Sequence, residues 1–262
     1  MIHQKFNSLL KTKWLGQNLC YDECVDSTNK VAKQLGVKNA PNGLVVLAEE
    51  QNAGKGRLGR GWFSPKGKGL WFSVLFRPKF VPEEAPKCTL MAAVAVAKAI
   101  NKICGVDAKI KWPNDILLNN KKLVGILSEM NAEYGKLNFV VIGIGINTNV
   151  DKSDFPDDVK DIAISLHTEA TKEFGRELLL AEILQELEIK IEQAEKEGFE
   201  NIFQEWRQMT CTLNKDVKVI AQDETYFGRA IDIDAGGMLI VERKDGKRVK
   251  VVAGDVSIRS VN

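Results

Sequence analysis

The sequence is poor in the residues that hold metals and form disulfides. Histidine occurs only at His3 and His167 in 262 residues, which argues against a site built from several histidine ligands. The five cysteines are odd in number, and no Cys-x-x-Cys pair occurs. Such usage is typical of reduced, apolar cysteines in the cytoplasm rather than of a disulfide framework. We therefore expect a cytoplasmic protein and no metal site made by its side chains alone.

Long apolar runs and a surplus of charge of either sign are also absent. The longest apolar stretch, residues 90–100, is interrupted by Lys98 and is shorter than the ~20 residues that cross a bilayer. Residues 1–14 lack the apolar segment of a signal peptide. Lys and Arg number 37 and Asp and Glu 35, which leaves a net charge of +2 and no general attraction to nucleic acid. We expect neither a membrane nor DNA as a partner.

The composition that remains is that of an ordinary globular protein. Hydrophobic residues make up 44% and charged residues 27% of the chain, which suffices to bury a core. From Asp216 onward the pattern changes to short strands joined by Gly-Gly and Asp-Gly turns, as in a small β-barrel. We therefore predict two domains, residues 1–213 and 214–262.

The hydrophobic patterning of the first domain predicts a mixture of strands and helices. Asp26-Ser27-Thr28 supplies an N-cap for the first helix, which Gly36 closes. Asn119-Asn120 marks the turn of a hairpin. The predicted strand segments are 20–26, 41–51, 70–78, 107–112, the hairpin 116–130, and 137–150. The predicted helices are 28–36, 88–104, 176–197 and 200–211.

The stretch GKGRLGRG, residues 54–61, contains the spacing Gly-x-Gly-x-x-Gly of dinucleotide-binding loops. That fingerprint requires a helix directly after the glycines, with its N-terminus at the pyrophosphate. Here Pro65 and further glycines follow, and then an aromatic strand. A Walker loop is excluded as well, because no Gly-Lys-Ser or Gly-Lys-Thr occurs in this loop. The dinucleotide interpretation is therefore poor.

The charges of this loop are more informative than its glycines. Residues 54–69 contain five cations and no acid, so the loop repels itself and is expected to be mobile until an anion with several oxygens orders it. One alternative is a solvated basic loop without a ligand. Flanking by Trp62 and Trp71 favours an anion site. The five cations are Lys55, Arg57, Arg60, Lys66 and Lys68.

A second polar group of residues lies in KWPNDILLNNKKLVGIL, residues 111–127. Trp112 is expected in the core, and Asn114 and Asp115 could simply cap the local backbone. Alternatively, Lys111 and Lys122 neutralise phosphate oxygens while the carboxylate of Asp115 holds a metal or takes a proton. The residues alone leave both interpretations open.

Taken together, AEEQNAGKGRLGRGW (48–62) and KWPNDILLNNKKLVGIL (111–127) resemble the biotin–protein ligases, also called biotin–[acetyl-CoA-carboxylase] ligases. Asp26-Ser27-Thr28-Asn29, GIGINTNV (143–150) and AGDVSIR (253–259) match further family segments in the same order. The resemblance covers about residues 20–262. It implies an α+β fold in which helices flank a central mixed sheet, as in class II aminoacyl-tRNA synthetases, with a C-terminal SH3-like barrel.

The resemblance also implies the reaction and its participants. Biotin and ATP, with Mg²⁺, give biotinyl-5′-AMP and pyrophosphate, and a lysine of a biotin carboxyl carrier domain then takes the biotinyl group and releases AMP. The short stretch before the first predicted strand resembles the monofunctional type, which lacks a DNA-binding winged helix and is no repressor. A homodimer is plausible from the same resemblance.

Site residues follow from the resemblance position by position. Lys55 stands where many members have arginine, so a cation remains but a bidentate clamp is lost. Asp115 is expected to receive the proton of the incoming lysine. The implied catalytic residues are Arg57, Lys122 and Asp115. The implied biotin-binding residues are Ser27, Thr28, Gln51, Lys55 and Gly125. The implied ATP- and adenylate-binding residues are Arg57, Arg60, Asn114, Asn147 and Arg259.

Two other functions are weighed against this one. A lipoate ligase shares the implied fold, but the KWPND and GKGRLGR stretches favour biotin. A nucleic-acid-binding module would pair the basic loop with aromatic side chains on which bases stack. The low net charge and the acids of the C-terminal domain, which include Asp223, Glu224, Asp232 and Asp234, argue against that module.

Overall fold

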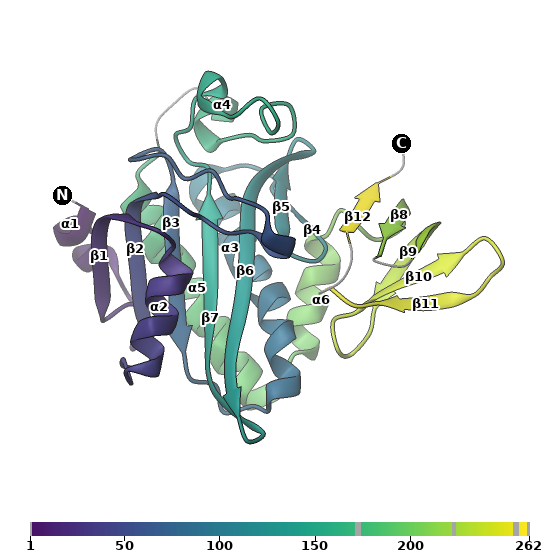
Figure 1. The fold of residues 1–262 in the computed structure, drawn as a ribbon, viewed down its shortest axis with the longest axis horizontal. Coiled ribbons are helices and arrows are strands. Elements are labelled where there is room, and N and C mark those ends of the chain that lie inside the picture. Colours follow the sequence, from purple (N-terminus) through teal and green to yellow (C-terminus); the bar gives the residue numbers. More distant parts are fainter. Residues whose placement is uncertain (1, 171–173, 222–223, 254–256, 261–262) are drawn as a thin grey trace.

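A seven-stranded mixed sheet forms the centre of the protein (Figure 1). The structure is a computed structural model that describes residues 2–170, 174–221, 224–253 and 257–260. The strand order is β1-β2-β3-β7-β6-β5-β4, in which β1 and β2 run parallel and every other neighbouring pair is antiparallel. The strands are β1 Leu19–Val25, β2 Leu44–Gln51, β3 Leu70–Phe76, β4 Lys109–Lys111, β5 Asp115–Leu118, β6 Lys121–Glu133 and β7 Lys136–Ile146.

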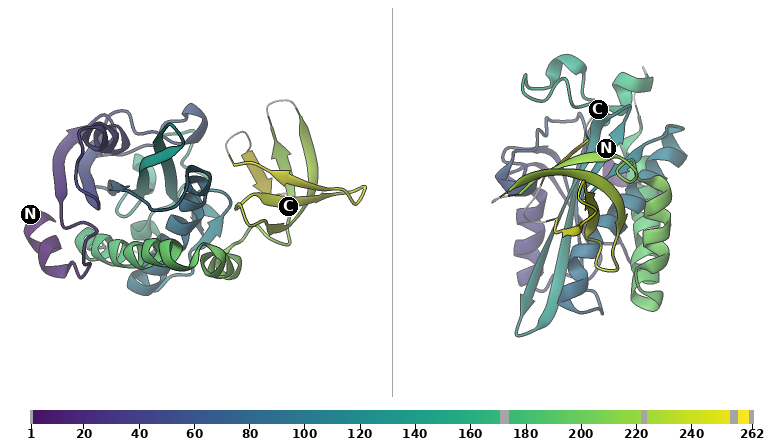
Figure 2. Two further views of the ribbon diagram at one scale, coloured as in Figure 1. Left: turned by 90° about the horizontal axis from the view of Figure 1, so that it is seen from below. Right: turned by 90° about the vertical axis from the view of Figure 1, so that its right-hand side faces the viewer.

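Helices cover both faces of this sheet, so the expected architecture of a mixed sheet flanked by helices is confirmed (Figure 2). Helix α2 packs on β2, β3 and β7 from one side, whereas α3 packs on the opposite face and carries α5 and α6. The helices are α1 Ile2–Leu9, α2 Thr28–Val37, α3 Cys88–Cys104, α4 Leu166–Ala170, α5 Arg176–Glu197 and α6 Glu200–Met209. Within the described ranges, no helix combines the length and apolar character that a membrane crossing requires.

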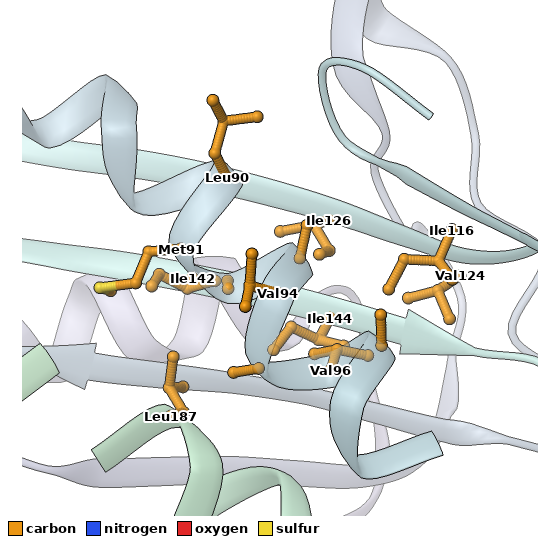
Figure 3. Packing of buried hydrophobic residues seen from close by; sticks show 14 of the residues in the cluster. Leu90, Met91, Val94, Val96, Ile116, Val124, Ile126, Ile142, Ile144 and Leu187 are labelled. Carbon is orange, nitrogen blue, oxygen red and sulfur yellow. The ribbon is translucent and has the colours of Figure 1, made fainter. Parts of the chain in front are cut away.

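The two faces of strand β7 have different surroundings: one face packs in the core and the other carries glycines. Alternate residues of a strand face opposite sides, so Ile142 and Ile144 point into the core against α3, where they are 0% and 2% exposed. Figure 3 shows them beside Ile126 of β6 and Val94 of α3. Burial of each such side chain stabilises the fold by about 1.5–3 kcal/mol. The intervening positions face the side of α2, where the glycines of β7 lie.

The C-terminal residues form a second, five-stranded antiparallel sheet in the order β11-β10-β9-β8-β12, as expected for an SH3-like domain. Hydrogen bonds tie it to the first sheet and its helices; for example, the Trp112 indole N–H donates to Gly237 O at 3.1 Å, and Arg207 Nε donates to Asp232 Oδ1 at 2.8 Å. The boundary between residues 213 and 214 stays a prediction. The strands are β8 Asp216–Ile220, β9 Thr225–Ile233, β10 Leu239–Arg243, β11 Arg248–Val251 and β12 Ser257–Ser260.

The predicted N-cap position of the first helix is confirmed at Ser27, whereas its predicted end at Gly36 was wrong. Helix α2 continues past Gly36 to Val37, and a Cβ on Gly36 would lie 2.6 Å from Leu75 and 2.9 Å from Phe139, so this glycine permits close packing on the sheet. Ser27 holds the N-cap position, but its side chain makes no capping hydrogen bond among the described residues. Gln51 of β2 caps the helix instead, because its Oε1 accepts from Thr28 N at 2.9 Å.

Most other predicted elements are present with small changes of length. The predicted strand 107–112 is reduced to β4, and a cis bond precedes Pro113. The helix predicted over 200–211 ends at Met209. Asn119 and Asn120 both have positive φ, 50° and 62°, as the predicted hairpin turn requires. Helices α1 and α4 were not predicted.

Candidate functional site

A pocket of about 260 Å³ opens on the α2 side of the sheet, between the basic loop and the strands β5–β7. The two segments singled out in the sequence therefore meet in space, along with the start of α2. The sequence-predicted residues that line this pocket are Ser27, Thr28, Gln51, Lys55, Arg57, Arg60, Asn114, Asp115, Lys122, Gly125 and Asn147. Arg259 lies on β12, and its side chain is outside the part of the chain that the structure describes.

The floor of the pocket is made of glycine backbone. Gly125 of β6 and Gly145 of β7 are direct cross-strand partners, and the indole of Trp62 lies over both. A Cβ would lie 2.8 Å from the Trp62 ring at Gly125 and 2.2 Å from its Nε1 at Gly145. Glycines are therefore required for a flat group to approach this floor. The resemblance places biotin at Gly125, a place that the Trp62 ring occupies in this structure.

The Trp62 ring contacts Lys122, Trp71 and the glycine floor, but its indole nitrogen lacks a hydrogen-bond acceptor among the described residues. The ammonium of Lys122 lies 5.2 Å from the ring centroid, within cation–π range. Trp71 packs edge-on against the ring, with 6.5 Å between centroids. Nε1 of Trp62 is buried and finds no acceptor among the described residues, and an unmade hydrogen bond of this kind costs about 1–3 kcal/mol. The half-buried Trp62 side chain therefore keeps one buried polar atom without a hydrogen bond among the described residues.

The basic loop has a backbone framework of its own. Gly56 N donates to Arg60 O and Trp62 N to Gly54 O, each at 2.8 Å, so the loop folds back on itself like a hairpin. Leu58 and Gly59 turn the chain with φ of 56° and 72°. A single turn of 3₁₀-helix, Arg57–Gly59, lies at the tip, and strand β3 rather than an α-helix follows. The expected mobility of the loop stays a prediction.

The five cations of the loop do not act as one group. Lys55, Arg57 and Arg60 line the pocket. Lys66 instead pairs with Glu23 at 2.6 Å, and Lys68 pairs with Asp151 at 2.6 Å, both away from the pocket. Fewer cations of the loop therefore face the pocket than the sequence indicated: three of the five.

Arg57 is anchored through both terminal nitrogens of its guanidinium. Its Nη1 donates to Asn114 Oδ1 at 3.0 Å, and its Nη2 donates to the carbonyl oxygen of Ala253. Burial lowers the pKa of the Arg57 guanidinium from its usual value, and the charge of Asp115 opposes that change. Asn114 also donates to Ile126 O at 3.0 Å. These partners are distant in sequence, so the interpretation of Asn114 as a local backbone cap is wrong.

Lys122 and Asp115 form an ion pair inside the pocket. Lys122 Nζ lies 2.7 Å from Asp115 Oδ1, on the adjacent strands β6 and β5. Among the described residues that line the pocket, Asp115 is the one acidic residue. The same lining also contains the cations Lys55, Arg57, Arg60 and Lys111. The balance of charge therefore favours anionic ligands. Trp112, expected in the core, is 2% exposed.

One wall of the pocket was missed by the sequence analysis. Asn147 anchors it: Asn147 Nδ2 donates to Ile164 O at 3.1 Å, and Asn147 N donates to Leu123 O at 3.1 Å. The chain that follows returns apolar side chains to the pocket, where Phe155, Val159 and Ile162 line it. In the sequence these three residues differ from polar ones only by being apolar. Core residues are apolar too, so the sequence could not identify these residues as part of the pocket.

Comparison with known proteins gives this fold and pocket a class. Residues 21–147 match the Biotin/lipoate A/B protein ligase family, and residues 212–259 match the Biotin protein ligase C terminal domain. The pocket residues up to Asn147 lie inside the first match, and the second covers the C-terminal sheet. The protein is thus an enzyme of the ligase class.

Individual relatives place the chain more closely. It is 40% identical to the bifunctional ligase/repressor BirA of Bacillus subtilis, over 95% of this chain and 76% of that protein. It is 33% identical to the biotin–[acetyl-CoA-carboxylase] ligase of Mycobacterium tuberculosis, over 82% of this chain and 79% of that one. The structure of the biotin protein ligase from Aquifex aeolicus in complex with biotin and ATP superposes with a TM-score of 0.81 at 26% identity, covering 94% of this chain and 100% of that one. The chain belongs to the biotin/lipoate A/B protein ligase family, and within it to the biotin protein ligases.

Proposed function

We propose that the protein attaches biotin to a lysine of a biotin carboxyl carrier domain, using ATP and passing through biotinyl-5′-AMP. One observation carries the proposal: a single pocket joins a polar wall at the start of α2, a glycine floor and the cations Arg57 and Lys122. The polar wall suits a urea, and the glycine floor suits a flat ring. The two cations suit a carboxylate that lies beside a phosphate.

The first step needs positive charge at a defined place, because the biotin carboxylate and the α-phosphate of ATP repel each other. Arg57 and Lys122 approach the pocket from different segments and would reduce that repulsion while the phosphorus–oxygen bond forms and pyrophosphate leaves. The anchoring of Arg57 by Asn114 fixes its guanidinium before substrate arrives. A preorganised hydrogen-bond donor stabilises the charge of the transition state with little reorganisation during the reaction.

Mg²⁺ is proposed to enter with ATP rather than to occupy a protein site. Among the described residues, no three His, Cys, Asp or Glu side chains come together, and Asp115 is engaged by Lys122. Mg²⁺ commonly keeps several waters and takes the remaining ligands from phosphates, so this lining fits a metal held mainly by the nucleotide, whose charge it would neutralise.

In the second step the carrier lysine attacks the carbonyl carbon of the mixed anhydride. A carbon–nitrogen bond forms, the carbon–oxygen bond to phosphate breaks, and AMP leaves with that electron pair. The attacking amine must lose a proton, because a lysine has a pKa of ~10.4 when unperturbed. Asp115 is the acceptor we propose, and it becomes available when the 2.7 Å pair with Lys122 loosens as Lys122 turns to the acyl phosphate.

Two finer features belong to the proposal. Biotin rather than lipoate is the substrate, supported by the hydrogen-bonding wall that a urea can pair with and a dithiolane cannot. The 262-residue protein does not repress transcription by binding DNA, supported by its net charge of +2. A DNA affinity that falls steeply with salt would contradict this second feature.

The decisive experiment incubates the protein with biotin, MgATP and a biotin carboxyl carrier domain, and follows the intact mass of that domain. The mass should rise by one biotinyl group, and lipoate in place of biotin should give no product. Arg57→Ala and Lys122→Ala should each slow adenylate formation by about 10²-fold or more, the range for a lost transition-state donor. If calorimetry detects neither biotin nor ATP binding, the proposal is wrong.

A further inference from the structure

Trp112 connects the pocket to the C-terminal sheet. It follows β4, at the side of the first sheet that lies next to the C-terminal sheet (Figure 1), and its side chain lines the pocket. Its backbone N–H donates to Thr212 Oγ1 at 2.8 Å, on the segment that leads into the C-terminal sheet. Its indole N–H donates to Gly237 O of that sheet at 3.1 Å, and buried indoles commonly find such a partner. The residue that begins the Pro113-Asn114 turn is therefore fastened to the C-terminal sheet.

The turn that carries Gly237 is itself fixed. Asp234 Oδ1 accepts from the backbone N–H groups of Gly236 at 2.8 Å and Met238 at 3.0 Å. Asp234 Oδ2 lies 2.9 Å from Nζ of Lys250 on β11. Burial would raise the pKa of Asp234, but Lys250 and the two N–H groups outweigh burial and lower it, so the side chain stays a carboxylate. The acceptor of the indole N–H is therefore linked to β11.

The chain that leaves β11 reaches the basic loop. β11 ends at Val251, and two residues later the carbonyl oxygen of Ala253 accepts from Arg57 Nη2. Arg57 Nη1 donates to Asn114 Oδ1 at 3.0 Å. Asn114 Nδ2 donates to Ile126 O at 3.0 Å, which fixes the amide orientation and turns Oδ1 to the guanidinium. The guanidinium is thus held from the first sheet and from the C-terminal sheet at once.

These contacts close into a circuit that passes through both sheets and returns to its starting point. Its members in order are Arg57, Asn114, Trp112, Gly237, the pair Asp234 and Lys250, and Ala253. Arg207 of α6 ties the C-terminal sheet separately, because it donates to Asp232 Oδ1 and to Ile233 O. Loss of the indole hydrogen bond should therefore shift the C-terminal sheet rather than detach it.

We propose that Trp112 is a positioning residue for adenylate formation and acts through Arg57. Its indole N–H fixes the C-terminal sheet, so that the carbonyl of Ala253 and the amide of Asn114 hold the guanidinium where carboxylate and α-phosphate meet. A small displacement of that group is costly, since an error of ~1 Å can slow a reaction by about 10²-fold. This inference rests on the proposed function for the reaction, and it adds a specific hydrogen bond through which the C-terminal sheet serves the first step.

The test is the single-turnover rate of biotinyl-AMP formation from biotin and MgATP in Trp112→Phe, which removes the indole N–H and keeps a buried ring. The rate constant should fall by about tenfold or more. The dissociation constant for biotin should stay within about threefold, or ~0.7 kcal/mol, because the proposed biotin contacts Thr28 and Gln51 lie on α2 and β2.

The matched control is Trp206→Phe. Trp206 of α6 is 0% exposed, lies outside the pocket lining, and its buried Nε1 finds no acceptor among the described residues. This variant loses the same part of a ring but no hydrogen bond. It should keep the rate constant within about twofold of the wild type. An equal loss of rate in both variants would show that shortening a buried ring is the cause, and would overturn the inference.

A double-mutant cycle separates positioning from general loosening. In the Arg57→Ala background, Trp112→Phe should change the rate constant by less than about twofold, because the group through which Trp112 acts is gone. If the loss of about tenfold persisted in that background, Trp112 would act independently of Arg57 and the inference would be wrong.

The remaining outcomes separate this inference from the proposed function. If Trp112→Phe fails to fold, β-(3-benzothienyl)alanine at position 112 decides, because sulfur replaces the N–H in a ring of nearly the same size. The same residue at position 206 is its control. Wild-type protein that forms no biotinyl-AMP refutes the proposed function, whereas a folded variant without the N–H of Trp112 that reacts at the wild-type rate refutes only the role of Trp112.

Discussion

A methyl group added to the glycine floor tests whether biotin lies there. In Gly145→Ala the new Cβ would sit 2.2 Å from Trp62 Nε1, whereas non-bonded heavy atoms settle at roughly 3.5–4 Å. The strand cannot retreat, because β7 is paired with Trp71 of β3 on one side and with Gly125 of β6 on the other. Either the indole rises by more than about 1 Å, or the ring of an incoming ligand does.

The size of the effect follows from that geometry. An extra methyl in an otherwise complementary floor weakens binding by about 1–3 kcal/mol, which is roughly 10- to 200-fold in affinity. We therefore expect the dissociation constant of Gly145→Ala for biotin to rise by at least about tenfold. The free energy of unfolding should change by less than about 2 kcal/mol, because the displaced Trp62 ring belongs to a loop and alanine suits a strand better than glycine does. Calorimetry measures the first quantity and urea unfolding the second.

The matched control is Gly175→Ala. Gly175 precedes α5, lies outside the pocket, and the nearest atom to an added Cβ is Glu177 Oε2 at 4.0 Å. This variant should bind biotin with wild-type affinity. If Gly145→Ala did so too, the ligand would lie elsewhere in the pocket, and the interpretation of Gly125 and Gly145 as its floor would be refuted.

Three further predictions concern the loop and the helices. Biotin should change tryptophan fluorescence by displacing the indole of Trp62, and Trp62→Phe should remove that change while the other four tryptophans remain. Glu188→Ala should lower the free energy of unfolding in urea by about 3 kcal/mol, because this 7%-exposed carboxylate accepts from three backbone N–H groups of residues 13–15. Burial would raise the pKa of Glu205, but Lys190 and Lys98 outweigh it and lower the pKa. The stability that the Glu205 carboxylate contributes should therefore be complete above pH ~4.3 and be lost as pH falls through the lowered pKa. The free energy of unfolding of Glu205→Gln in urea should accordingly depend less on pH below ~4.3 than that of the wild type.

The sequence revealed those parts of the fold and site that depend on neighbours along the chain. The alternation of residues 70–78 predicted a strand close to β3, and the alanine-rich run 88–104 predicted a helix that matches α3. The basic loop and the KWPND segment could be recognised because each keeps its chemistry within a few residues. Their meeting in one pocket was inferred from resemblance, since nothing local brings Arg57 to Asn114, 57 positions away.

The errors and omissions share one physical cause, which is packing between segments distant in sequence. Gly36 looks like a helix end because glycine commonly ends helices. Its actual role, close packing on Phe139, depends on a strand about a hundred residues away. Ser73 looks like one polar interruption of an apolar strand. Its partners Thr28 and Asn29 are 45 and 44 positions away, so only the folded structure shows that its hydroxyl contacts residues of the pocket wall.

Strand β7 explains why the site and the core can be altered separately. Ile142 and Ile144 face α3 and are almost fully buried, so shortening them leaves a cavity and lowers stability. Gly143 and Gly145 alternate with them and face the pocket, where a Cβ at Gly143 would come within 2.0 Å of Asn29 Oδ1. A methyl at Gly143 thus displaces the Asn29 amide and its hydrogen bond with Ser73, and one at Gly145 fills the floor. Because one strand carries both rows, the pocket is supported directly by the buried core. Substitutions that spare the isoleucines should therefore affect ligand binding more than folding.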